Sequence, residues 1–307
     1  MEEKLYSVAV ILINYNSSAF TLPAVQSIRQ RTAPPLDYLI VVVDNNSRPD
    51  DYAQLAGLAA YDNVKLVHSR VNLGFAGGNM LGVQFAKARY YYFLNNDCLL
   101  LNDCLGTLYA FCENNPRVGL CSGQMYDEHE QLQPTFGYFP TLGSKLLGHG
   151  LVRWLNPAQY PPRWQAYAAP LRVPVISGSS MFMPAPALGQ IGGFDTTYFL
   201  YLEEEDLAYR VRAAGYEAWL VPGARYQHLG GKSTTRNLAI EKEFYISFLY
   251  FYRKYYGRWK TGLMQAFLFF KLARKVFRHR NNGKLALFVL NGAPARESLR
   301  HRQKMFT

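Results

Sequence analysis

The sequence predicts an α/β protein whose central sheet is largely parallel, followed by a basic helical segment. Continuous apolar runs lie at residues 7–16, 37–47, 63–69 and 90–101, and stretches with helical character lie among them. Runs without polar alternation are typical of strands buried on both faces. Asn and Asp stand at the ends of three of these runs. Ligands of open α/β sheets bind beyond the carboxyl ends of the strands, so we expect the site there.

Two helices are expected in the first half of the chain. Apolar residues recur at Leu22, Val25 and Ile28, which predicts a helix over residues 19–30. A glycine-rich opening followed by a helical pattern predicts another over residues 75–88. Strands alternating with helices favour a Rossmann-like arrangement.

The second half of the chain is less regular. Residues 124–172 are rich in Pro, Gly, Tyr and Trp, and we expect loops and short elements over a cleft. Residues 173–184 predict a further strand. Residues 192–216 hold a cluster of acids and a helix, and residues 217–231 complete the body.

Charge is unevenly distributed along the 307 residues, whose formal net charge is +11. Residues 232–307 carry 17 Lys and Arg against 3 Asp and Glu, whereas the first 231 residues carry 16 against 19. A near-neutral body with a basic C-terminal region indicates an anionic partner for that region.

Cysteine usage and the N-terminus point to a cytoplasmic protein. Cys98, Cys104, Cys112 and Cys121 lack the CxxC spacing of zinc sites, so we expect free thiols in a reducing compartment. Residues 1–16 begin acidic and contain only a short apolar run, unlike a signal peptide. No stretch reaches the ~18 apolar residues that a membrane-spanning helix needs.

The cluster Asn95-Asn96-Asp97 ends a predicted strand. A hard cation prefers oxygen ligands, and Mg²⁺ often takes one or two carboxylates together with phosphate oxygens. Asn and Asp are also common in plain turns, so both interpretations stay open. His228 follows another apolar run, and a lone His is more often structural than catalytic.

The segment NLGFAGGNMLG, residues 72–82, lies between a strand and a helix. Backbone N–H groups at a helix start can bind phosphate, but glycines also allow close packing, and both interpretations stay open. The later segment HLGGKST is not a P-loop, because Tyr226 stands where that motif needs Gly.

Four consecutive acids, Glu203, Glu204, Glu205 and Asp206, follow the aromatic run YFLYL. They suit the first turn of a helix, and Asp206 is spaced to pair with Arg210. That interpretation leaves the apolar run before them unexplained. Crowding and burial raise the pKa of a carboxylate toward neutrality, which suits a general base.

Seven segments, taken in order, resemble family 2 glycosyltransferases: VAVILINYN, VVVDNNS, NLGFAGGNMLG, YFLNND, ISGSSMFM, GGFDTTYFLYLEEEDLAYR and VPGARYQHLGGKS. The resemblance spans roughly residues 5–235 and is strongest to the bacterial rhamnosyltransferase-like branch, which builds cell-surface polysaccharides. It implies the Rossmann-like GT-A fold, a nucleotide-diphosphate sugar as donor, and inversion at the anomeric carbon. The resemblance to this branch suggests rhamnose from a dTDP donor.

The resemblance implies a division of the chain. Residues 1–235 would form the GT-A domain, with a donor half at about 1–123 and an acceptor half at about 124–235. Residues 236–307 would form a C-terminal amphipathic helical region.

The resemblance also implies roles for site residues. Asp97 and His228 would hold a divalent metal, Mg²⁺ or Mn²⁺, on the donor diphosphate, although Asn95 replaces the first acid of the family motif. Glu204 would be the general base, as Glu in place of Asp, with Glu203 and Asp206 beside it. The donor would contact the following residues: Tyr15, Asn16, Asp44, Gly77, Gly78, Asn79, Asn95 and Asn96.

The basic tail predicts an amphipathic helix. Within LMQAFLFFKLARKVFRHR, the residues Lys271, Arg274, Lys275 and Arg278 would share one helix face. Such a helix either binds the inner face of an anionic membrane or packs on the body with a solvated basic face. The family often uses a glycan or polyprenyl-linked oligosaccharide acceptor, which favours the membrane.

Three other functions stay open. A nucleic-acid-binding protein would use the basic tail, but it would leave the acids unexplained, so no nucleic acid is expected. A nucleotidyltransferase would need a basic glycine-rich loop near the first strand, and residues 14–23 contain no Lys or Arg. A degenerate nucleotide-sugar-binding protein is consistent with Asn95 and Glu204.

Overall fold

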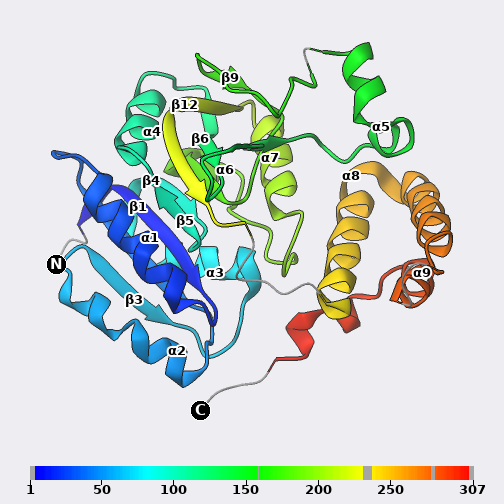
Figure 1. Ribbon diagram of the computed structural model, residues 1–307, viewed down its shortest axis with the longest axis horizontal. Coiled ribbons are helices and arrows are strands. Elements are labelled where there is room, and N and C mark those ends of the chain that lie inside the picture. The colour runs from blue at the N-terminus through cyan, green and yellow to red at the C-terminus, as the bar shows by residue number, and fades with distance from the viewer. Residues whose placement is uncertain (1–3, 158, 231–236, 278–280, 304–307) are drawn as a thin grey trace.

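The computed structural model describes residues 4–157, 159–230, 237–277 and 281–303. A twisted sheet lies at its centre, and a group of helices lies beside it (Figure 1). The principal strands are β1 (Leu5–Asn14), β2 (Tyr38–Asp44), β3 (Val64–His68), β4 (Lys87–Leu94), β5 (Cys98–Leu100), β6 (Val118–Tyr126), β11 (Ser180–Pro184) and β12 (Glu217–His228). They are ordered β3-β2-β1-β4-β11-β6-β12-β5.

The sheet is mostly parallel. β1 pairs in parallel with β2 and β4, β2 with β3, and β6 with β12. β11 runs antiparallel between β4 and β6, and β5 runs antiparallel to β12 at the edge. The predicted α/β architecture is therefore confirmed.

Helices cover both faces of the sheet. The helices are α1 (Ser18–Arg31), α2 (Pro49–Gln54), α3 (Gly74–Val83), α4 (Cys104–Glu113), α5 (Leu142–Leu155), α6 (Ala185–Gln190), α7 (Glu203–Ala213), α8 (Leu238–Ala273) and α9 (Asn281–Leu290). Apolar residues of α1 and α4 pack on one face, and those of α3, α6 and α7 pack on the other. This burial on both faces explains why the strands read as continuous apolar runs.

Two predicted elements differ from the structure. The helix expected over residues 75–88 ends at Val83, and β4 begins at Lys87, because the aromatic run that follows is drawn into the sheet. The strand expected over residues 173–184 is two strands, β10 (Val175–Ile176) and β11, separated by a turn at Gly178.

The irregular stretch also holds more regular structure than expected. Residues 124–172 contain the end of β6 and the helix α5. They contain the short strands β7 (Leu132–Gln133), β8 (Phe136–Gly137) and β9 (Leu171–Arg172) as well. Thr141 caps α5 by accepting a hydrogen bond from the backbone N–H of Ser144.

The C-terminal helices form a third apolar cluster. α8 is divided at Gly257, whose φ of 75° and ψ of 172° are not helical. Its first part and α9 share that cluster with Tyr198 and Leu202, which precede the acids of α7. The C-terminal region is thus packed directly on the segment that carries the acids.

The basic run is only partly helical. Lys271 lies in α8, but the helix ends at Ala273, so Arg274 and Lys275 follow it in a turn. Arg278 lies outside the described residues. In the described part of the chain, none of the helices combines the length and apolarity needed to cross a membrane.

Candidate functional site

Asp97 and His228 meet at the end of the sheet. Asp97 lies between β4 and β5, and His228 is the last residue of β12, which pairs with β5. The Asp97 Oδ1 atom is 3.2 Å from the His228 Nε2 atom, and the Asp97 side chain is buried. Residues 131 positions apart therefore converge, as the resemblance implied.

These two side chains fit a divalent metal. A carboxylate oxygen and an imidazole nitrogen are ligands that Mn²⁺ accepts, and Mg²⁺ suits the carboxylate. Ligand-capable atoms of Asp97, Cys98 and His228 lie within 4.8 Å of one another. Burial raises the pKa of the Cys98 thiol well above its usual range, and its Sγ donates toward the Ser179 carbonyl. Asp97 and His228 are therefore the better ligand pair.

A serine–glycine turn links this pair to the acids of α7. The backbone N–H of Asn95 donates to the carbonyl of Ser179 at 2.9 Å. On the other side of the turn, a Cβ atom on Gly178 would lie 3.6 Å from the carboxyl carbon of Glu204. The turn between β10 and β11 thus has the strand-end cluster on one side and Glu204 on the other.

The acids occupy the first turn of α7, as the sequence predicted. Tyr201 and Leu202 before them have positive φ values of 74° and 68°. This conformation is strained for residues other than glycine, and such strain is common at functional sites. Glu203 is buried, whereas Glu204 and Glu205 are half-buried.

Burial dominates the electrostatics of the three glutamates. It raises the pKa of Glu203 and Glu205 well above their usual range, and the charge on Glu204 raises both further. Burial also raises the pKa of Glu204, while a hydrogen bond with the Glu205 side chain lowers it. A carboxylate that binds protons more tightly than usual is suited to accept one from a hydroxyl group.

Asp206 has a structural environment unlike that of its neighbours. It is fully buried, and Arg210 donates to its Oδ2 atom at 2.7 Å, so the predicted i,i+4 pair is present. Lys254 and Tyr255 of α8 donate to its Oδ1 atom at 2.6 and 2.7 Å. The sequence did not indicate these two partners, because they lie almost 50 residues away.

The carboxyl ends of β1 and β2 form a buried polar network. The Asn14 side-chain amide donates to the carboxylates of Asp44 and Asp51 at 2.9 Å each. The other oxygen of Asp44 accepts from the Ser47 N–H and lies 3.0 Å from Nδ1 of His68. Asp44 is fully buried, so its carboxylate is directed into the protein; contact with a nucleotide stays a prediction.

Tyr15 and Asn16, unlike Asp44, lie at the surface. Both are exposed after β1, and Asn16 has a positive φ of 52°, held by its backbone bond to Ser47 and by the Arg48 N–H on its side chain. An exposed aromatic ring at a strand end is a surface on which a nucleobase can stack.

Two further donor predictions fall on buried residues. Gly78 and Asn79 lie inside α3, where a Cβ on Gly78 would come within 3.0 Å of the Ile13 side chain. The glycine here has a packing role. The Gly77 Cβ would meet Leu73 of its own helix. Binding by these residues stays a prediction.

Asn95 and Asn96 differ in burial and in their hydrogen-bond partners. Asn96 is buried, and its amide donates to Ser17 and Thr21 of the α1 segment at 2.7 and 2.8 Å. Asn95 is half-buried and faces the serine–glycine turn through its backbone. Asn96 thus ties the strand end to α1.

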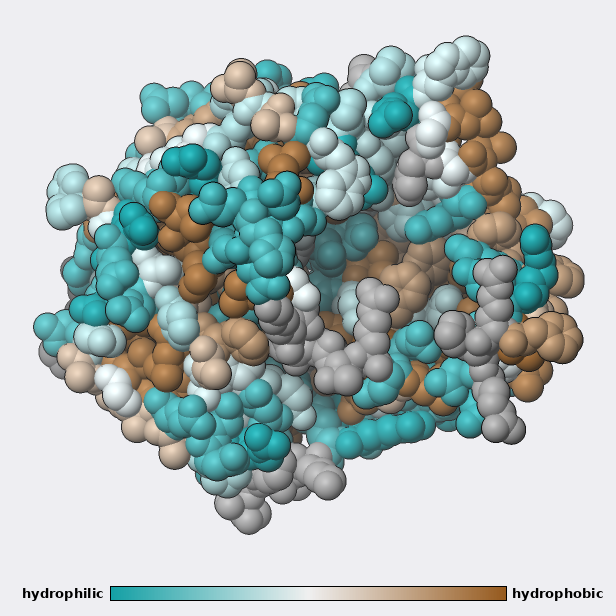
Figure 2. All heavy atoms as spheres, in the orientation of Figure 1, coloured by the Kyte–Doolittle hydropathy of each residue, from teal (hydrophilic) through white to brown (hydrophobic). Residues whose placement is uncertain are grey.

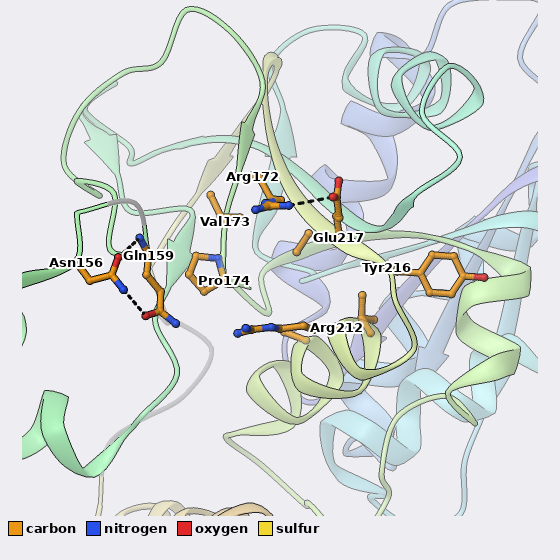
Figure 3. Close-up of a pocket in the computed structure, with 11 residues that line it drawn as sticks. Asn156, Gln159, Arg172, Val173, Pro174, Arg212, Tyr216 and Glu217 are labelled. Atoms are coloured by element: carbon orange, nitrogen blue, oxygen red, sulfur yellow. Dashed lines mark hydrogen bonds and ion pairs between the residues drawn. The ribbon is translucent and has the colours of Figure 1, made fainter. Parts of the chain in front are cut away.

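A pocket of about 450 Å³ lies between α7, β9 and the start of β12 (Figure 3). Arg212 points into it, whereas Arg172 is tied to Glu217 at 3.0 Å. None of the residues predicted for the site lines this pocket.

The chain is similar to known glycosyltransferases. The model of the family described as Glycosyl transferase family 2 matches residues 9–173. An N-acetylglucosaminyl-diphospho-decaprenol L-rhamnosyltransferase of Mycobacterium tuberculosis is 25% identical over 274 residues, 83% of this chain and 87% of that protein. Rhamnosyltransferase WbbL of Escherichia coli is 26% identical over 163 residues, 50% of this chain and 60% of that protein.

A solved structure agrees with the fold. The mannosyltransferase PcManGT of Pyrobaculum calidifontis, in complex with GDP-Man and Mn²⁺, aligns with a TM-score of 0.56 and 17% identity over 82% of this chain. The alignment spans 64% of that chain. The fold is that of the GT-A glycosyltransferases. With the family model matching more than half of its residues, the chain belongs to glycosyl transferase family 2 and is a glycosyltransferase.

Proposed function

We propose that this protein transfers rhamnose from a dTDP donor to a hydroxyl group of a cell-surface glycan or lipid-linked acceptor, with inversion at the anomeric carbon. The observation that carries the proposal is the serine–glycine turn, which has the Asp97–His228 pair on one side and Glu204 on the other. The two rhamnosyltransferases among the relatives support the choice of sugar.

Glu204 acts as the general base. The acceptor hydroxyl oxygen attacks the anomeric carbon, its proton passes to the Glu204 carboxylate, and the bond from the anomeric carbon to the diphosphate oxygen breaks. Burial raises the pKa of Glu204, which favours proton uptake by its carboxylate, while the hydrogen bond with Glu205 lowers that pKa. Asp206 positions the helix that carries Glu204, through Arg210 and Lys254.

Asp97 and His228 would hold a divalent metal, Mg²⁺ or Mn²⁺, which would stabilise the negative charge of the departing diphosphate. The buried network around Asn14 keeps the ends of β1 and β2 rigid, and Tyr15 offers the exposed ring for the nucleobase. We further propose that the protein works in the cytoplasm, at the inner face of the cell membrane.

The experiment is a thermal shift of the whole protein against nucleoside diphosphates and nucleotide sugars, with and without Mg²⁺ or Mn²⁺. A ligand at 100 times its dissociation constant adds about 2.7 kcal/mol of stability. We expect the thymidine nucleotides to stabilise the protein most, and more strongly with metal. Stabilisation by a different nucleotide would replace the proposed donor.

Release of nucleoside diphosphate distinguishes the proposed transferase from the leading alternative. A degenerate nucleotide-sugar-binding protein would show the thermal shift but release no nucleoside diphosphate when donor and acceptor are both supplied. Multiple turnovers of nucleoside diphosphate release would exclude it. Binding of RNA or DNA at moderate salt, with no response to any nucleotide, would favour the nucleic-acid alternative.

A further inference from the structure

One end of the molecule exposes large apolar side chains on two helices. The first helix is α5, which is interrupted at Gly148. The side chain of Trp154 is 77% exposed, and four leucines of α5 are exposed with it: Leu146, Leu147, Leu151 and Leu155. Single exposed apolar residues are ordinary, but five within ten positions of one helix are a surface of a different kind.

The second helix is the part of α8 after Gly257. Met264, Leu268 and Leu272 are its buried side, facing the third apolar cluster. Its outer side exposes Trp259, at 80%, and Phe270, at 62%, together with Leu263. Phe277 in the turn beyond the helix is fully exposed.

The two helices lie at the same end of the molecule. Figure 1 shows α5 above the second part of α8, on the side away from β1. Lys145 of α5 lies over the ring of Phe248 in α8, at 5.6 Å from its centroid. In the space-filling view, hydrophobic residues gather along this margin (Figure 2). We call the exposed apolar residues of α5 and of the second part of α8 the apolar end.

The charged residues within α5 and the second part of α8 have one sign. The sequence contains no Asp or Glu between Glu130 and Asp195, and none between Glu243 and Glu297. All of α5 and nearly all of α8 fall within these stretches. Exposed cations flank the apolar residues on both helices: Arg153, Arg258, Lys260, Lys271, Arg274 and Lys275.

We propose that the apolar end docks into the surface of an anionic lipid bilayer. Exposed Trp, Leu and Phe side chains enter the headgroup and acyl boundary, and the flanking cations contact anionic headgroups. A second copy of the chain fits this surface less well. A twofold contact would bring cations against cations, with no acid in either helix to compensate for them.

The segment that leads into α5 packs on the helix that carries the acids, because the ring centroid of Phe139 lies 5.7 Å from that of Tyr209 in α7. Burial lowers the pKa of Lys145, as does the positive charge of Lys271, while the charge of Glu205 partly offsets these effects. Lys145 of α5 therefore lies within electrostatic range of Lys271 in α8 and of Glu205 beside Glu204. Docking would hold the acceptor side of the site against the bilayer; this consequence rests on the proposed function, whereas docking itself does not.

The test is sedimentation of the full chain with vesicles, without donor or acceptor. We expect binding to vesicles of phosphatidylcholine with phosphatidylglycerol, weakening with added salt, and little binding to phosphatidylcholine alone. Replacing one residue from each helix, Leu147→Glu with Trp259→Glu, should weaken binding at least tenfold. The matched control is Leu5→Glu, because Leu5 is 53% exposed on β1, away from the apolar end.

Folding and the alternative occupant are checked on the same samples. Thermal melting must show that both variants remain folded, and quenching of Trp emission by brominated lipid in the wild type reports insertion directly. Absence of wild-type binding, or equal binding by the paired variant, would overturn the proposal. A dimer that the paired variant abolishes, without vesicle binding, would identify the end as a contact between copies.

Transfer to a short soluble acceptor is measured separately. Absence of vesicle binding by the wild type, with transfer retained, would reject docking and leave the proposed function in place. Vesicle binding without transfer to any acceptor would reject the proposed function and leave docking in place.

Discussion

Lys254 of α8 donates a hydrogen bond of 2.6 Å to Asp206 of α7. The same ammonium group contacts Asp195 at 2.7 Å, in the loop that leads to the acids. Lys254 of α8 therefore binds both the loop before the acids, at Asp195, and the helix that carries them, at Asp206. This relationship makes the basic region a structural part of the site.

Replacing Lys254 with Met should lower the free energy of unfolding by about 1–3 kcal/mol, because Asp206 stays buried with fewer donors. Urea unfolding measures the change. Lys260→Met is the control, because Lys260 is exposed further along α8. Equal stability of the two variants would show that the contact with Asp206 contributes little.

Asp97→Asn and His228→Ala should remove the metal dependence of nucleotide binding. Each variant loses one of the two converging ligand atoms. Calorimetric titration with dTDP, with and without Mn²⁺, measures the effect. Asp50→Asn, at an exposed carboxylate, should leave the metal response intact. A full Mn²⁺ response in both site variants would place the metal elsewhere.

The raised pKa values of Glu203 and Glu205 predict a stability that falls as pH rises. A carboxyl group with a raised folded-state pKa binds more protons in the folded than in the unfolded state. Its contribution is therefore lost as pH rises from about 4.5 through the folded-state value. Glu205→Gln should be more stable than the wild type at pH 8, with the difference shrinking toward pH 5. Parallel stability curves for the two proteins would contradict the shift.

Two glycines of α8 should respond to alanine in opposite directions. Gly257 has a positive φ, so Gly257→Ala should destabilise the protein by about 1–2 kcal/mol. Gly262 lies in regular helix with open space at its Cβ, so Gly262→Ala should stabilise it by about 0.5–1 kcal/mol. Thermal unfolding measures both, and a stabilising Gly257→Ala would contradict the break in the helix.

The sequence predicted the elements whose burial is uniform. β1, β2 and β4 are buried over most of their length, and polar residues follow each of them as predicted. The structure of residues 124–172 was harder to predict. α5 buries no continuous apolar face, so its leucines and tryptophan do not follow the pattern of a helix packed on a core. The break in α8 at Gly257 could not be predicted, because a single glycine in the sequence does not indicate a non-helical backbone conformation.

The partners of the acids were beyond sequence reasoning for a different reason. The spacing of Asp206 and Arg210 predicts their pair within one helix. Lys254 and Tyr255 reach Asp206 only because α8 packs on the segment around Tyr198 and Leu202. Likewise, the resemblance implied a nucleotide contact for Asp44 but not its partners Asn14 and His68, which lie beside its carboxylate; the nucleotide contact stays a prediction.

In the proposed reaction, Glu204 accepts the proton of the acceptor hydroxyl. The most direct measurement compares Glu204→Gln with Glu205→Gln in rate of sugar transfer and in donor affinity. We predict that Glu204→Gln lowers the transfer rate by about 10²- to 10⁴-fold with unchanged donor affinity, and that Glu205→Gln retains most of the activity. Transfer by Glu204→Gln at the wild-type rate would contradict the account.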